Sequence, residues 1–105
     1  MLIARHYKLR FFAALLSISA EGLAYAADPA KGSELYALHC ATCHGVSGVS
    51  MMPGAPNFSK NEGLMSPDGA LLISIQNGRG AMPAYRGILN AQDTLDVISH
   101  LRTLN

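Results

Sequence analysis

The sequence predicts an all-α fold, and three observations carry that prediction. Helix-capping residues and apolar spacings of three and four mark three separate segments. No segment shows the sustained alternation of polar and apolar residues that a strand would show. The part of the chain after the apolar N-terminal stretch, residues 27–105, has only 79 residues. A chain of that size generally needs a cofactor or a covalent staple to complete its core, so we expect helices wrapped around a bound group.

The first predicted helix starts at Asp28, an N-cap residue followed by Pro29, whose missing N–H costs nothing in the first helical turn. It runs towards the two cysteines of the chain. Four residues recur at intervals of four, four and three and should share one helical face: Gly32, Tyr36, Cys40 and Cys43. That face must point at a bound group or at another helix.

The second predicted helix begins around Ser66-Pro67-Asp68 and stops at Gly78, with an apolar stripe of Leu71, Leu72 and Ile75. The third begins at Asn90, with Asp93 three residues later in a capping-box arrangement. Its apolar residues make an amphipathic helix: Val97, Ile98, Leu101 and Leu104. The loops over residues 45–62 and 79–89 are rich in glycine, proline and methionine, a composition that usually covers an apolar surface.

The segment Cys40-Ala41-Thr42-Cys43-His44 contains both cysteines and places a histidine directly after the second. This pattern is typical of covalent haem attachment. Two thiols three positions apart can reach two vinyl groups of one haem, and the imidazole of His44 is then carried beneath the iron as proximal ligand. Gly45, which can adopt positive φ, lets the chain turn away from the ring.

Three other interpretations of these five residues are less favoured. A redox dithiol expects a βαβ setting, which the chain does not offer, yet it is the main alternative. A structural zinc site needs four grouped ligands, and the other histidines form no second pair: His6, His39 and His100. A disulfide would close a loop of two intervening residues and gain little.

Residues 1–26 are predicted to be a secretory signal peptide, and residues 27–105 the haem domain. Three basic residues precede an apolar stretch over 11–20, and Ala24-Tyr25-Ala26 is a small-x-small cleavage signal before Ala27. An uncleaved anchor is the alternative, but a span needs about 20 apolar residues and Glu21 interrupts the run. We therefore expect a periplasmic protein with no membrane anchor after cleavage.

The charge of the haem domain gives no sign of a nucleic-acid surface. Residues 27–105 hold five basic and six acidic side chains, hence a net charge of −1, without clusters of Lys or Arg. Redox proteins that dock transiently at the haem edge are the expected partners, and the expected state is a monomer. Four apolar residues are candidates to frame that edge: Val46, Met51, Ala81 and Pro83.

The sixth iron ligand is the choice that decides the function. Among the methionines of the haem domain, Met52 and Met82 each precede a proline. Met82 lies beyond the second predicted helix, so its loop can return across the face opposite His44. Met52 is only eight residues past His44 and would have to cross the ring quickly. Spacing therefore favours Met82 as the sixth ligand, and Met52 stays an alternative candidate.

From Asp28 to its C-terminus the chain resembles the class I c-type cytochromes, the small monohaem type of bacterial periplasms. The matching pieces are Gly32, Tyr36, Cys40-x-x-Cys43-His44-Gly45, Pro56-Asn57-Phe58, residues 78–85 and Asn90 to Leu104. The resemblance implies the cytochrome c fold, one haem c and Met82 as axial ligand. It also implies that the carbonyl of Pro56 accepts a hydrogen bond from the other ring N–H of His44.

The resemblance further implies that the first and last helices cross closely, with Gly32 and Tyr36 opposite Val97, His100 and Leu101. The chain departs from the family pattern at Ala55, often glycine, and at Phe58, often leucine. His100 stands where an aromatic residue is common, and we interpret it as a packing residue. His39 should point away from the ring, with a solvated side chain.

The expected function is one-electron transfer without catalysis, because electron transfer needs no bond to a substrate and a six-coordinate haem leaves no open position for oxygen. Two alternatives stay open. A five-coordinate haem could bind gases or react with peroxide if Met82 did not bind. The chain could also be a fixed haem subunit of a periplasmic oxidoreductase, which would need a large apolar interface.

Overall fold

The computed structural model describes residues 26–105, and residues 1–25, nearly all of the predicted signal peptide, lie outside the described part. Its regular elements are helical: α1 Pro29–His39, α2 Ala41–His44, the 3-10 helix η1 Phe58–Lys60, α3 Asp68–Asn77 and α4 Ala91–Leu101. The all-α prediction is confirmed. α3 and α4 are the second and third predicted helices, α1 and the short α2 together cover the first, and η1 is an addition. No helix within residues 26–105 is long and apolar enough to cross a membrane.

The first predicted helix is broken at Cys40 instead of running through both cysteines. Cys40 has φ −120° and ψ −35°, so α1 ends at His39 and α2 starts at Ala41. Helical bonds are present on each side of the break, since Cys40 N–H donates to Tyr36 O at 2.9 Å and His44 N–H donates to Cys40 O at 3.0 Å. The change of direction divides the predicted common face. Gly32 and Tyr36, the first two residues of that face, meet α4, whereas Cys40 and Cys43 line a cavity.

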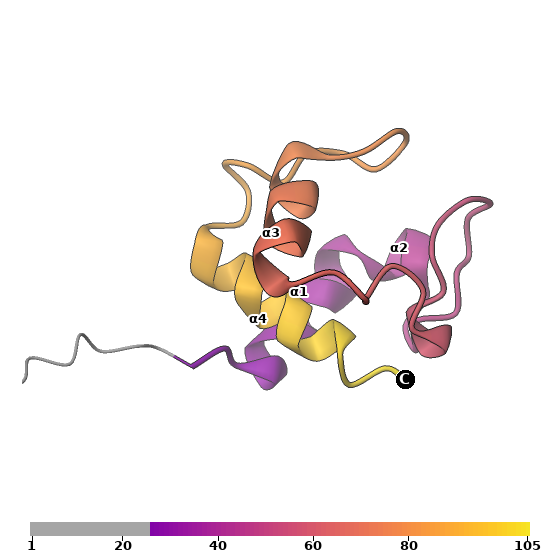
Figure 1. The fold of residues 1–105 in the computed structure, drawn as a ribbon, viewed down its shortest axis with the longest axis horizontal. Helices are drawn as coiled ribbons and strands as arrows, with labels where there is room; N and C mark the ends of the chain where they lie inside the picture. Colours follow the sequence, from indigo (N-terminus) through magenta and orange to yellow (C-terminus); the bar gives the residue numbers. More distant parts are fainter. Residues whose placement is uncertain (1–25) are drawn as a thin grey trace, which may run out of the picture.

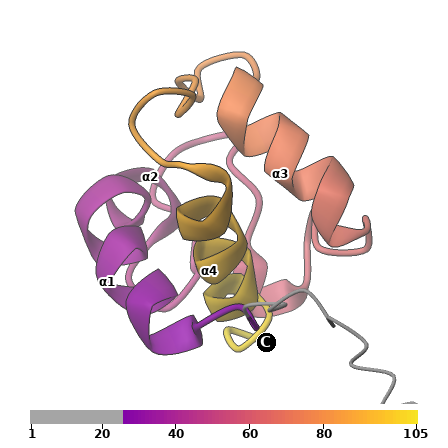
Figure 2. The same ribbon diagram turned by 90° about the vertical axis from the view of Figure 1, so that its left-hand side faces the viewer.

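α1 and α4 cross at a glycine. A Cβ on Gly32 would lie 1.8 Å from the carbonyl oxygen of Asp96, so only a bare Cα permits this approach. Tyr36 and Val97 at the crossing are each 1% exposed, and the Tyr36 ring lies 5.0 Å from the ring of His100. The predicted close crossing is observed, and His100 is a packing residue as expected. α4 lies between α1 and α3 (Figures 1 and 2).

The predicted caps explain where the helices begin and end. The Asp28 carboxylate accepts from the N–H groups of Ala30 and Lys31, and Asn90 and Asp93 form a complete capping box. α3 ends at Asn77, and its C-cap Gly78 has φ 73°. α4 ends at Leu101, three residues before the predicted Leu104, which follows the turn after α4 and packs on the core.

The core lies under the α1–α4 crossing and extends towards the loops. Its buried residues come from four parts of the chain: Tyr36, Phe58, Leu64, Leu89, Val97 and Leu101. Phe58 and Leu64 belong to the segment between α2 and α3, so the glycine- and proline-rich loop is tied to the helices by its own apolar side chains. This arrangement leaves a space between the α2 side, α3 and the loop that follows α3.

Candidate haem site

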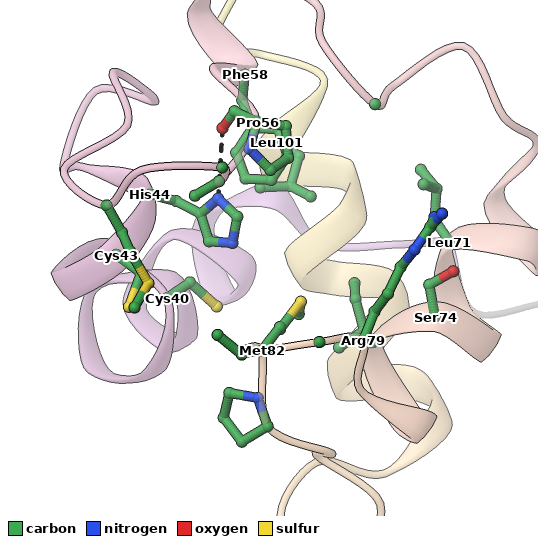
Figure 3. Close-up of a pocket in the computed structure, with 18 of the residues that line it drawn as sticks. Cys40, Cys43, His44, Pro56, Phe58, Leu71, Ser74, Arg79, Met82 and Leu101 are labelled. Carbon is green, nitrogen blue, oxygen red and sulfur yellow. Dashed lines mark hydrogen bonds between the residues drawn. The ribbon is translucent and has the colours of Figure 1, made fainter.

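A cavity of about 660 Å³ opens between α2, α3, α4 and the two predicted loops. Its lining is mainly apolar, as is usual for a cofactor site. All five predicted site residues line it: Cys40, Cys43, His44, Pro56 and Met82. Figure 3 shows the two cysteines at one end, with His44 and Met82 reaching in from opposite sides. His44 and Met82, which lie 38 residues apart in the sequence, therefore meet around one space.

The two cysteines are not joined in a disulfide, and each is half-buried at one end of the cavity. Burial, and secondarily the neighbouring Cys43, raises the pKa of the Cys40 thiol to about 11. A dithiol that works by disulfide exchange requires a lowered thiol pKa, because the thiolate is the attacking species. The environment of Cys40 is therefore unfavourable for an attacking thiolate at this residue.

His44 is held in one orientation by contacts on two sides. Its Nδ1 lies 3.4 Å from the carbonyl oxygen of Pro56, and its ring stacks on Phe58 with centroids 4.5 Å apart and planes 23° apart. Burial lowers the pKa of His44, against a smaller rise from the Pro56 carbonyl, so the neutral imidazole is favoured. With the proton on Nδ1, the other ring nitrogen keeps its lone pair and points into the cavity (Figure 3).

A buried phenol ties α2 to the helix crossing. Tyr36 Oη donates to the carbonyl oxygen of Gly45 at 2.6 Å, directly after His44. Gly45 has φ 79°, and a Cβ there would lie 1.9 Å from the Val49 carbonyl oxygen. Burial raises the pKa of Tyr36 to about 12, so the phenol stays a donor at any physiological pH. The sequence singles out Tyr36 as a packing residue, and its hydrogen bond to Gly45 was not predicted.

Met82 sits on a tight two-residue turn. Arg79 N–H donates to Met82 O, and Met82 N–H to Arg79 O, each at 3.0 Å. The loop then returns to α3, where Tyr85 N–H donates to Ile75 O at 3.1 Å. The Tyr85 hydroxyl donates to His39 O at 2.7 Å and so joins this loop to the end of α1. These bonds hold the thioether of Met82 facing His44 across the cavity (Figure 3).

The other methionines of the described region differ in their access to the cavity. Met52 also contributes to its lining and is 41% exposed, so the cavity alone does not remove it as a candidate ligand. Met51 and Met65 are 73% and 85% exposed and are not among the lining residues.

The prediction for His39 is wrong. Its side chain is half-buried at the rim of the cavity and packs edge-on against Tyr85, with ring centroids 5.9 Å apart. The reason is the hydrogen bond from Tyr85 to the His39 carbonyl, which draws the two rings together. Because these residues lie 46 positions apart, helical spacing around Cys40 could not reveal the contact.

Comparisons with known proteins show the family to which the chain belongs. Residues 27–101 match the family model described as cytochrome c oxidase, cbb3-type, subunit III. The chain is 33% identical to cytochrome c6 of Thermosynechococcus vestitus, over 82% of this chain and 79% of that protein. It is 31% identical to cytochrome c6 of Picosynechococcus, over 74% of each chain. Identity to cytochrome c6 of Pyropia yezoensis is 31%, over 75% of this chain and 74% of that one. The chain therefore belongs to the cytochrome c family and, as a member of it, is a one-electron carrier, not an enzyme, with one covalently bound haem c.

Proposed function

We propose that this electron carrier holds its haem through Cys40 and Cys43 and binds the iron with His44 on one side and Met82 on the other. The observation that supports this most directly is the approach of His44 and Met82 from opposite sides of one apolar cavity whose end carries both thiols. When bound, the haem supplies a reversible ferric–ferrous couple, and a thioether with an imidazole favours the ferrous state. Pro56 orients the imidazole by accepting its Nδ1 proton.

The protein's own part is to keep these groups in place and to keep water out. His44 is 8% exposed, and Phe58, Leu64 and Leu101 close the cavity behind it. The Met82 turn is fixed by backbone bonds to Arg79 and by the bonds of Tyr85. Rigid ligands on both sides mean little rearrangement when the charge changes by one, which suits a carrier better than a gas-binding protein.

The carrier is proposed to work in the periplasm after removal of residues 1–26, as a shuttle that docks transiently. Val46 and Met51, 82% and 73% exposed, lie in the loop just after His44 and offer a small apolar contact. With two haem carboxylates added, the charge of the domain is about −3, so long-range steering of partners should be weak. Because the matching family model is described as an oxidase subunit, a fixed subunit is the second candidate. Co-purification of a partner at endogenous levels would favour that candidate.

The ligand assignment is tested by three alanine variants of the holoprotein. Met82→Ala should abolish the weak long-wavelength thioether-to-iron band of the ferric protein, lower the reduction potential and admit carbon monoxide. Met52→Ala and Met51→Ala are the matched controls and should keep all three properties. Loss of the band in Met52→Ala, with its retention in Met82→Ala, would reverse the assignment. A wild type without the band would support the five-coordinate alternative.

A further inference from the structure

Arg79 is distinctive among the residues that line the cavity. Within residues 26–105, it contributes the only permanently charged side chain of that lining, which is otherwise apolar apart from hydroxyl, thiol and imidazole groups. A haem carries two carboxylates, and a carboxylate near an apolar wall is stabilised by a cation that can hydrogen-bond to it. A guanidinium suits this because its N–H groups match the two oxygens of one carboxylate.

The Arg79 side chain has no partner in the described part of the chain, unlike the other two arginines there. Arg102 forms an ion pair with Asp68 at 2.7 Å and also donates to backbone carbonyls. Arg86 donates to Asn77 Oδ1 at 2.8 Å. No hydrogen bond or ion pair of the Arg79 guanidinium is found among residues 26–105. Arg79 is therefore free to bind an anion.

The location of Arg79 matches the expected place of a haem carboxylate. In Figure 3, Arg79 and Ser74 lie on the α3 side of the cavity, across from Cys40 and Cys43. The carboxylates of a haem are on the edge opposite the vinyl groups, so attachment at the cysteines directs them towards α3. The backbone of Arg79 is also bonded twice to that of Met82, which fixes the spacing between cation and thioether.

We propose that the guanidinium of Arg79 binds a haem propionate carboxylate, with the Ser74 hydroxyl beside it. The Met82 turn then holds the cofactor at two points, the iron through the thioether and the ring edge through the cation. This inference rests on the proposed attachment at Cys40 and Cys43. Because the cation stays near the iron in both redox states, it also favours the ferrous form, which carries one positive charge fewer.

Two measurements on the holoprotein test this. In the ferrous protein, NMR should show a nuclear Overhauser contact between the δ-methylene protons of Arg79 and a propionate methylene. In electron exchange with a reference carrier of known potential, Arg79→Gln should shift the equilibrium constant about two- to tenfold towards the oxidised form. Arg79→Lys should shift it less. Arg86→Gln removes an equal charge from the same loop and should leave the equilibrium near wild type.

Absence of the Overhauser contact, or equal shifts in Arg79→Gln and Arg86→Gln, would overturn the proposal. Failure of the proposed function gives different results. Haem released on a denaturing gel would refute the attachment, and a missing long-wavelength band in the wild type would refute Met82 ligation. The Overhauser contact depends on neither the band nor the potential, so it decides the role of Arg79 even if Arg79→Gln loses its Met82 ligand.

Discussion

The two sides of the cavity are held by different means. The imidazole side, formed by α1, α2 and residues 45–58, is built into the helix crossing through Tyr36, and His44 is 8% exposed. The thioether loop, residues 78–85, is largely exposed and is held by backbone bonds to α3 and by one phenol. Damage to the imidazole side should therefore unfold the domain. Damage to the thioether loop should release Met82 while the domain stays folded.

The largest effect is expected at the helix crossing. Gly32→Ala places a methyl group 1.8 Å from the Asp96 backbone oxygen, and backbone on both helices cannot move aside cheaply. We expect a loss of about 3 kcal/mol or more, measured by denaturant unfolding of the holoprotein.

Gly69→Ala is the matched control for Gly32→Ala, because Gly69 is also helical and a Cβ there meets nothing within 4 Å. It should be neutral or stabilise by about 0.5–1 kcal/mol through helix propensity. Similar unfolding midpoints for the two variants would show that the crossing is not the structural support of the imidazole side.

The second expected effect is local to the thioether loop. In Gly78→Ala the new Cβ would lie 2.7 Å from Met82 O and from Ala84 N, and the alanine would also have to adopt φ 73°. Gly80→Ala shares the positive φ, 57°, but meets nothing within 4 Å. We expect Gly78→Ala to weaken or lose the long-wavelength band at a temperature where far-ultraviolet circular dichroism is still native. Gly80→Ala should cost only about 1 kcal/mol of backbone strain and keep the band. Simultaneous loss of the band and of helicity in Gly78→Ala would contradict a separate loop.

The same change, removal of one tyrosine hydroxyl, can be made on the imidazole side and in the thioether loop, so the two regions can be compared directly. Tyr36→Phe leaves the Gly45 carbonyl without its donor inside the core, which should cost about 1–3 kcal/mol of global stability. Tyr85→Phe removes the half-buried bond to His39 O and should cost about 0.5–1.5 kcal/mol, seen first as thermal loss of the band. Denaturant unfolding followed by circular dichroism and by absorbance separates the two outcomes. A larger global loss in Tyr85→Phe would reverse the comparison.

The contrast between the regions also explains which features the sequence could predict. Residue type and spacing within a few positions indicate the caps at Asp28 and Asn90, the stop at Gly78 and the cysteine motif. The break at Cys40 and the wrong prediction for His39 have a different origin. They depend on contacts between distant segments, such as Tyr85 with the end of α1, which short-range periodicity does not encode. Loop length and family resemblance favoured Met82 over Met52 as the ligand. The backbone bonds that hold the Met82 loop against α3 could be found only in the folded structure.

The smallest expected effect is a pH dependence at the helix crossing that supports the imidazole side. Burial against Tyr36 lowers the pKa of His100 below its unfolded value of 6.5. The unfolded chain therefore binds this proton more readily, and stability is lost as the pH falls from above 6.5 towards the folded pKa. His100→Tyr keeps an aromatic ring at this position and removes the titration. We expect the melting temperature to fall less in the variant than in wild type between pH 7.5 and pH 5.5. Parallel profiles for the two proteins would show that protonation of His100 does not loosen the crossing.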